Sequence, residues 1–487
     1  MTAMNQEALI SSVVQEVLRR VQPQESSDTA TVGATPMLRP VASSDGPAMQ
    51  GPGLFTDVDA AVDAAARSQQ QLAAAGLEVR DGICKLFKRM SKENATEWGR
   101  FELEETKIGR LDHKIQKLEL LDGVPGVEFF TTKAHSGDQG ISLDEAAPWG
   151  VLGVITPVTH SIPTLTSNAI SMIAAGNSMV VNPHPSGAKS AALATVAYNK
   201  AIKEEFGIDA LICVIDPPTL RSAEQIFRHA RVGLLVATGG PGVARAALKQ
   251  QKRAIVAGPG NPPVVVDETA DFDNAARSII AGAAFDNNLL CVGEKEVFVV
   301  ESVFEAMMEA MRRAGAVELT GEQIKRLEQV AFMFEKDHHA VNKDYVGADT
   351  DVLGRAAGAD VRPGVDLLFG ETDESSPFVN EEQMMPFVPF VRCHDFNHGL
   401  DLAIKYEHGF GHTAVIHSNN LDHITRMGQA MNTTLFVANG PTTACLGAGG
   451  EGNASYSIAT PTGEGVTNPL TFSRFRRLSV SGALRIV

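Results

Sequence analysis

The sequence has few cysteines, and none of them is arranged to form a disulfide framework or a metal site. Five cysteines are spread over 487 residues: Cys84, Cys213, Cys291, Cys393 and Cys445. There is no C-x-x-C pair and no spacing typical of zinc ligands, so no metal site is expected. An odd, unpaired set of thiols fits the reducing cytosol.

The sequence also lacks an excess of positive charge and any long apolar run. Lys and Arg number 42 against 58 Asp and Glu, a formal net charge of -16. This balance argues against binding to nucleic acid or to an anionic membrane surface. No apolar run approaches the roughly 20 residues that span a bilayer. A phosphorylated cofactor is still possible, because local backbone amides can bind one inside an acidic protein.

The body of the chain alternates β-rich runs with helical patterns. Short β-rich runs are expected at 151–155, 179–181, 212–215 and 234–236, with helices such as 189–203 and 222–229 between them. Such alternation is typical of a parallel, doubly wound sheet. A second alternating set runs from 264 to 437. The sequence thus predicts an α/β fold with a dinucleotide-binding domain at 53–257, a catalytic domain at 258–440 and a C-terminal segment at 441–487.

The N-terminal residues form a separate amphipathic segment. Apolar residues recur there at three- and four-residue spacing, which predicts a helix with one apolar stripe: Leu9, Ile10, Val13, Val14, Val17, Leu18 and Val21. Glu7 and Glu16 exclude a continuous signal-peptide core. Residues 22–52 are rich in Pro, Gly, Ser, Thr and Ala, which predicts a flexible linker. The segment 1–21 is interpreted as a docking peptide, and the alternative is a helix that packs on its own core.

Three loops follow predicted strands, at the place where open α/β sheets bind ligands. The third contains glycines that let backbone amides approach a diphosphate near a helix N-terminus. Together the loops predict a dinucleotide cleft. For any single loop, an ordinary tight turn is an equally common explanation. The candidate cofactor residues in them are Thr156, Pro157, Asn182, His184, Thr238, Gly239 and Gly240.

The order of several motifs resembles that of the aldehyde dehydrogenase superfamily. It is most similar to the CoA-acylating propionaldehyde and acetaldehyde dehydrogenases of bacterial microcompartments. The resemblance covers the chain from about residue 53 to the C-terminus. It rests on T-P-x-T at 156–159, A-G-N at 175–177, N-P-H-P at 182–185, T-G-G at 238–240, G-N-P-P at 260–263, F-D-N-N-L-L-C at 285–291 and T-P-T-G-E-G at 460–465.

The resemblance implies a role for Cys291 as the nucleophile. Its thiol would attack the aldehyde carbonyl, and hydride loss to NAD would leave a thioester. The Cys291 backbone amide would be one donor to the oxyanion. His160 aligns near the asparagine that serves as the second donor in most of the superfamily, so the resemblance makes it the candidate second donor here. The alternatives are a locally hydrogen-bonded histidine at 160 and a donor role for Asn168.

Two further positions bear on which reaction the protein catalyses and on how it binds its cofactor. Ala257 aligns with the general-base glutamate of hydrolytic members, so the acyl group is expected to pass to coenzyme A instead of water. A hydrolytic aldehyde dehydrogenase is the alternative. Glu382 matches the glutamate that holds the nicotinamide ribose, with solvated surface charge as its alternative, and Gly258 joins it as a cofactor residue. NAD is expected by analogy, and NADP is not excluded.

The same resemblance implies partners and a location. Residues 4–21 look like an encapsulation peptide that binds a microcompartment shell protein in the bacterial cytoplasm. Residues 128–148 and 466–487 look like the hairpin and strand through which such enzymes form dimers or tetramers, with a local sheet as the alternative. Propionaldehyde is the favoured short-chain aldehyde. A catalytically silent docking subunit remains the rival from another class of protein.

Overall fold

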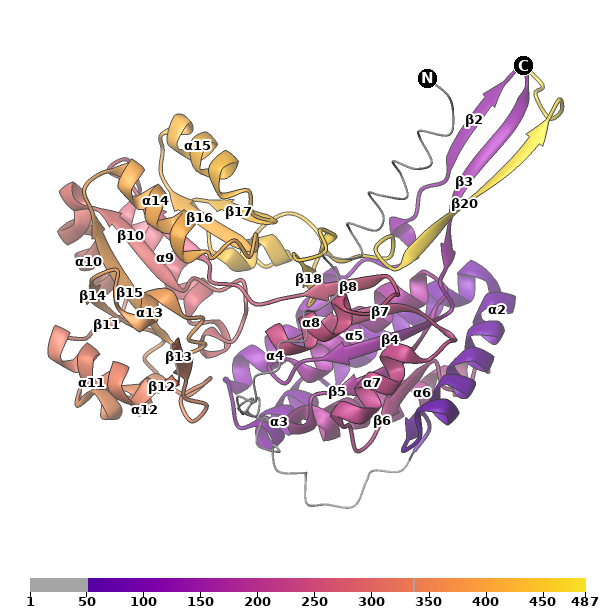
Figure 1. Cartoon of the computed structure of the whole chain (residues 1–487), viewed down its shortest axis with the longest axis horizontal. Coiled ribbons are helices and arrows are strands. Elements are labelled where there is room, and N and C mark those ends of the chain that lie inside the picture. Colours follow the sequence, from indigo (N-terminus) through magenta and orange to yellow (C-terminus); the bar gives the residue numbers. More distant parts are fainter. Residues whose placement is uncertain (1–50, 336–337) are drawn as a thin grey trace, which may run out of the picture. The chain divides into compact units, whose positions relative to one another are not determined.

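The computed structural model describes residues 51–335 and 338–487. The predicted docking peptide and nearly all of the predicted linker therefore lie outside the described residues. Two parallel sheets with helices packed on both faces make up most of the described chain (Figure 1), which confirms the predicted α/β class. Across the described ranges, no helix combines the length and apolar character that crossing a membrane requires.

The first sheet contains the three loops predicted to bind a cofactor. Its strands are all parallel and lie in the order β1 (Leu54–Phe55), β6 (Ile212–Ile215), β5 (Ser178–Pro183), β4 (Val151–Thr156), β7 (Val232–Thr238) and β8 (Ala254–Ala257). Because β5, β4 and β7 are neighbours, the loops at their carboxyl ends share one edge of the sheet. The helices that pack on this sheet are α2 (Val58–Glu93), α5 (Ser161–Ala174), α6 (Ala188–Phe206), α7 (Leu220–Arg228) and α8 (Pro241–Leu248).

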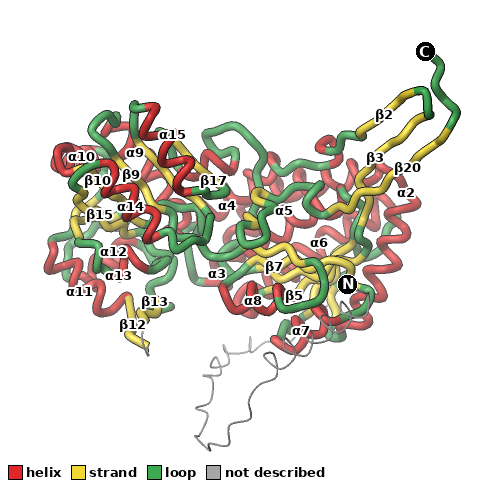
Figure 2. The backbone as a smooth tube through the Cα atoms, turned by 45° about the horizontal axis from the view of Figure 1, so that its top comes forward, coloured by secondary structure: helices red, strands yellow, loops and turns green. Residues whose placement is uncertain are grey.

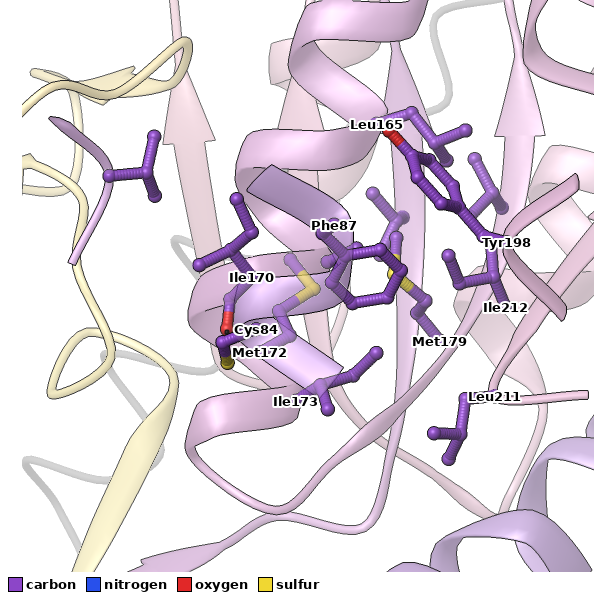
Figure 3. Packing of buried hydrophobic residues seen from close by; sticks show 14 of the residues in the cluster. Cys84, Phe87, Leu165, Ile170, Met172, Ile173, Met179, Tyr198, Leu211 and Ile212 are labelled. Carbon is purple, nitrogen blue, oxygen red and sulfur yellow. Dashed lines mark hydrogen bonds between the residues drawn. The ribbon is translucent and has the colours of Figure 1, made fainter. Parts of the chain in front are cut away.

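Both faces of this sheet are buried because successive side chains of a strand point to opposite faces. Leu152 and Val154 join the cluster under α5 and α6, whereas Val151 and Ile155 join the cluster under α7 and α8. Figure 3 shows the first of these clusters. In it Tyr198 packs edge-on against Phe87, with ring centroids 4.8 Å apart. This layer fixes α5, whose N-terminal end carries the His160 loop.

The second sheet carries the nucleophile segment. Its parallel strands lie in the order β11 (Val317–Glu318), β14 (Leu368–Thr372), β15 (Phe387–Cys393), β10 (Glu296–Val300), β9 (Pro263–Val266), β16 (Thr413–His417) and β17 (Leu435–Ala438). One face packs on α9 (Phe272–Ala283) and α10 (Phe304–Arg313), and the other on α14 (Phe396–Tyr406) and α15 (Leu421–Met431). Further elements of this region are α11 (Gly321–Ala331), β12 (Phe332–Glu335), β13 (His338–Val341), α12 (Thr350–Ala357) and α13 (Pro377–Asn380).

A third, antiparallel sheet forms an arm, visible as three long strands in Figure 2. Its central strand β3 (Gly140–Pro148) pairs with β2 (Lys133–Gly137) on one side and β20 (Ser473–Ser481) on the other. The C-terminal strand thus pairs within its own chain. Phe475 and Leu478 on β20 are 68% and 52% exposed.

Candidate active site

Cys291 follows a backbone turn of unusual conformation. The short helix η4 (Phe285–Asn288) contains three consecutive residues with positive φ: Asp286 at 49°, Asn287 at 55° and Asn288 at 65°. Each non-glycine residue in this region costs about 1 kcal/mol, and such strain concentrates at functional sites. The turn leaves Cys291 partly exposed, while Leu290 and Val292 on either side of it are buried.

Side-chain amides hold this turn in place. Asn287 Nδ2 donates to Gly347 O at 2.9 Å and to Asp349 Oδ1 at 2.8 Å. Asn288 Nδ2 donates to Glu294 O at 2.9 Å. The sequence F-D-N-N therefore supplies residue types that tolerate positive φ, and its two asparagines also supply the hydrogen-bond donors that hold the turn.

A buried lysine lies beside the nucleophile. Lys295 Nζ donates to Asn288 O at 2.8 Å and Leu290 O at 3.2 Å, and also contacts Asn288 Oδ1. Its side chain is fully buried. Lys295 was not predicted from the sequence, because a single lysine is usually a solvated surface charge. Its position four residues after the nucleophile was the one feature of the sequence that could have indicated a role beside Cys291.

The ionisation of Cys291 depends on these neighbours. Burial and, to a smaller extent, the negative charge of Glu382 raise the pKa of the Cys291 thiol to about 12, even though Lys295 opposes both. The thiol is thus protonated at neutral pH, and its attack on a carbonyl requires proton loss. Lys295 supplies the nearby positive charge that favours the thiolate.

Glu382 lies close enough to Cys291 for its charge to act on the thiol, and the backbone amide of Gly260 contacts its carboxylate. Burial raises the pKa of Glu382 to about 7, while Lys295 and the Gly260 backbone amide lower it. A Cβ on Gly260 would lie 2.5 Å from Cys291 O and 2.9 Å from Cγ of the buried His412. Gly260 thus lets Cys291 O and the His412 ring pack closely against its backbone, a role that was not expected from the sequence.

His160 lies directly before α5 and is buried. Its Nδ1 has no hydrogen-bond partner among the described residues. Burial, together with Lys117 and Lys114, holds the pKa of His160 well below its usual range, so the ring is neutral. The alternative, Asn168, lies within α5 and accepts a hydrogen bond from Ser457 Oγ at 3.2 Å.

The three strand-end loops offer space and polar atoms for a dinucleotide. Thr156 Oγ1 is buried without a partner in the described part of the chain. Gly239 and Gly240 lie directly before α8, and a Cβ added to either would have no heavy atom within 4 Å, so their backbone faces open space. These features fit the phosphates of a dinucleotide at a helix N-terminus.

Other predicted cofactor residues have partners within the protein. Asn182 Oδ1 accepts from Ser222 Oγ at 2.5 Å, and His184 Nδ1 accepts from the Ser186 amide at 3.1 Å. Thr238 Oγ1 is 2.8 Å from Ser457 Oγ. Pro157 follows β4, and Gly258 follows β8, where an added Cβ would lie 3.0 Å from Pro461 Cγ.

Within residues 51–335 and 338–487, no group of three or more His, Cys, Asp or Glu side chains could hold a metal ion.

Glu294, three residues after the nucleophile, provides a test of this buried environment. Its carboxylate accepts hydrogen bonds from Thr442 N and Thr442 Oγ1, both at 2.9 Å, and burial raises the pKa of Glu294 to about 7. A raised pKa in the folded state means that stability is greatest below the ordinary carboxyl pKa and falls as the pH rises through 7. The shift of the Glu294 pKa from 4.5 to about 7 corresponds to about 3 kcal/mol of folding free energy that is lost between low and high pH.

We therefore expect Glu294→Gln to flatten the pH dependence of thermal unfolding. Glutamine keeps an oxygen for the Thr442 amide and cannot lose a proton. Melting temperatures measured from pH 5 to 8 should fall more steeply for the wild type than for the variant. Parallel curves for the two proteins would contradict a buried, titrating Glu294.

The chain is similar to known aldehyde dehydrogenases. The family model described as "Aldehyde dehydrogenase family" matches residues 53–462. The acetaldehyde dehydrogenase (acetylating) of Salmonella typhimurium is 42% identical over 439 residues, covering 89% of this chain and 94% of the relative.

Solved structures with the same fold include two propionaldehyde dehydrogenases. One, from the fucose utilisation bacterial microcompartment of Clostridium phytofermentans, has a TM-score of 0.87 and 38% identity, covering 90% of this chain and all of that one. The other, from Rhodopseudomonas palustris, contains bound CoA and an acylated cysteine; its TM-score is 0.86 at 37% identity, covering 89% of this chain and 99% of that one. The chain belongs to the aldehyde dehydrogenase family.

Proposed function

We propose that this protein oxidises a short-chain aldehyde, propionaldehyde in preference, to an acyl-CoA while reducing NAD. The observation that carries the proposal is the partly exposed Cys291 on its strained turn, together with Ala257 at the end of β8. Similar proteins named acetylating and CoA-propanoylating dehydrogenases support this reaction.

The reaction would proceed through a thioester on Cys291. The Cys291 thiol loses its proton and its sulfur bonds to the aldehyde carbon, which gives a thiohemiacetal. The developing oxyanion is stabilised by the Cys291 backbone amide and, in this proposal, by neutral His160 as the second donor. Bound NAD would supply the acceptor for the hydride that leaves the same carbon. The thiol of CoA then attacks the thioester and releases Cys291.

Ala257 determines the fate of the acyl group. Its side chain is small, apolar and only 6% exposed, so it cannot remove a proton from water. Attack by water therefore lacks a general base at this position, whereas CoA brings a strong nucleophile of its own. The related structure with bound CoA and an acylated cysteine supports this acyl transfer.

The dinucleotide would bind at the carboxyl edge of the first sheet. Gly239 and Gly240 leave room for the phosphates, and the unpartnered Thr156 Oγ1 supplies a polar contact. Glu382 would hold the nicotinamide ribose near Cys291, as its proximity to the thiol supports. The roles of Asn182 and His184 on the adenosine side, and the preference for NAD over NADP, are proposed by analogy.

We further propose a microcompartment location and an oligomeric state. Residues 4–21 would bind a shell protein and place the enzyme inside a bacterial microcompartment in the cytoplasm. The related Clostridium phytofermentans enzyme is described as coming from such a compartment, which supports this location. The arm of β2, β3 and β20, with Phe475 and Leu478 exposed, would bind a second copy of the chain.

The proposed reaction is tested by whether turnover requires CoA. Reduced nicotinamide is followed by absorbance with propionaldehyde and NAD, with and without CoA, and the product is identified by mass spectrometry. We expect turnover only with CoA, and propionyl-CoA as the product. Free propionate formed without CoA would favour the hydrolytic alternative. Absence of turnover over a panel of aldehydes and both nicotinamide cofactors would favour a silent docking subunit.

A further inference from the structure

Four buried charged residues contact both the loop that carries His160 and the turn before Cys291. Glu102 lies on α3 (Ala95–Thr106), Lys114 and Lys117 on α4 (Leu111–Glu119), and Asp286 on η4. Their side chains are at most 3% exposed. Lys114 Nζ lies 3.1 Å from Glu102 Oε1 and 3.7 Å from Asp286 Oδ2, and Lys117 Nζ makes a close ion pair with the same Asp286 oxygen. We call these four residues the buried ion quartet; their formal charges sum to zero.

On one side the quartet holds the backbone before and after His160. Lys117 Nζ donates to Thr159 O at 3.1 Å, and Lys114 Nζ reaches the same oxygen at 3.5 Å. Glu102 Oε2 accepts from the Ile162 amide at 2.8 Å. The loop that carries His160 is thus bound by the quartet at the residue before it and at the second residue after it.

On the other side the quartet holds the strained turn before Cys291. Asp286 is the first of the three residues with positive φ, and its Oδ1 accepts from the Arg110 amide at 2.8 Å. The Asp286 amide donates to His113 Nδ1 at 2.9 Å, and the His113 ring stacks on Phe285 with centroids 4.7 Å apart. Lys114 and Lys117 therefore connect this turn directly to the His160 loop.

Stability alone does not account for such a cluster. Removing four charges from water has a large desolvation cost, and well-packed apolar residues of similar volume are often as stable or more stable. What a buried cluster of ion pairs supplies is directional geometry. Here that geometry relates two segments that are far apart in the sequence, since Lys117 and Asp286 are 169 residues apart.

We propose that the buried ion quartet is a positioning device that holds the His160 loop and the Cys291 turn in the relative placement needed for attack on the aldehyde. In this proposal its members act through the two segments and not by contact with the substrate or the cofactor. The proposal rests on the proposed function, in which both Cys291 and the His160 loop take part. Tyr456 adds a further link, because its hydroxyl donates to Lys117 O at 2.8 Å while its ring packs 5.7 Å from the His160 ring.

The test is a double-mutant cycle between the quartet and His160. Asp286→Asn keeps an oxygen for the Arg110 amide but removes the charge that pairs with Lys117. We expect kcat to fall about 10- to 100-fold, with KM for the aldehyde changed less than about threefold, because misplacement by 1 Å can cost that much in rate. With His160→Ala already present, the same change should cost only a few-fold. If the double variant instead loses kcat by the full product of the two separate losses, the quartet and His160 are not coupled and the proposal is overturned.

Alkylation of Cys291 by iodoacetamide, followed by peptide mass spectrometry, gives a readout that needs neither CoA nor NAD. We expect Asp286→Asn to change its rate constant at least about threefold, and an unchanged rate would overturn the placement of Cys291 by the quartet. A changed rate in a protein that never forms acyl-CoA would support the positioning role and refute the proposed function.

A second variant and a control complete the test. If Asp286→Asn does not fold, Glu102→Gln removes a charge at the other end of the quartet and keeps an oxygen for the Ile162 amide; the same losses in kcat are expected. Glu205→Gln breaks an exposed ion pair with Arg89 in the same half of the protein, and it should change neither kcat nor alkylation. An equal loss in the control would contradict a specific role for the quartet.

Discussion

Acyl-CoA formation is expected to fall at least about 10⁴-fold in the Cys291→Ala variant, because no thioester can form without the sulfur. The methyl group of alanine fits the space of the thiol, so folding and NAD binding should persist. The measurement is reduced-nicotinamide formation in the presence of propionaldehyde, NAD and CoA, with melting temperature and NAD affinity measured on the same samples.

Cys445 provides the matched control for this experiment. Among the described residues it is the other cysteine that is partly exposed, and burial raises the pKa of its thiol to about 11. Cys445→Ala should keep at least half of the wild-type activity. If Cys291→Ala retained turnover and Cys445→Ala lost it, the nucleophile would be assigned to the wrong cysteine.

A loss of about 100-fold in kcat is expected from the single methyl group added by Gly260→Ala. The new Cβ would lie 2.5 Å from Cys291 O and within 3.1 Å of two atoms of the His412 ring, so backbone or ring must move. Displacement of the nucleophile by about 1 Å costs on the order of 100-fold. The amide of Gly260 also contacts Glu382, so the KM for NAD should rise as well.

Gly321→Ala is the control for the effect of an added methyl group. Gly321 begins α11, and no heavy atom lies within 4 Å of a Cβ there. This variant should match the wild type in kcat and in KM, and its melting temperature should be equal or slightly higher because alanine favours a helix over glycine. Wild-type kcat in Gly260→Ala would mean that the Cys291 turn adapts freely, and the strained turn would lose its assigned importance.

The parts of the fold that depend on local pattern were predictable from the sequence. The β-rich run expected at 151–155 is β4, and the run expected at 234–236 lies within β7. Thr156 and Thr238 could therefore be placed at strand ends from local pattern alone. The helix expected at 189–203 lies within α6, and the one expected at 222–229 overlaps α7 up to Arg228.

The parts that depend on contacts between distant segments could not be predicted. Lys114 and Lys117 lie three residues apart on a helix, a pattern typical of a solvated face, yet both are buried. Their burial requires Asp286, and nothing local to α4 indicates that partner. Lys295 was missed for the same reason, since its acceptors are carbonyl groups of a turn whose shape the sequence does not specify.

The pairing of β20 with β3 also has a consequence for the newly made chain. Arg474 Nε donates to Pro148 O across a sequence separation of 326 residues. At ribosomal speeds of about 5–20 residues per second, β3 emerges some tens of seconds before its second neighbour exists. During that interval the hairpin of β2 and β3 has an open edge, and a lone hairpin is only marginally stable in water. The arm is therefore among the last parts of the protein to mature, and nascent chains on one messenger are at risk of pairing with each other there.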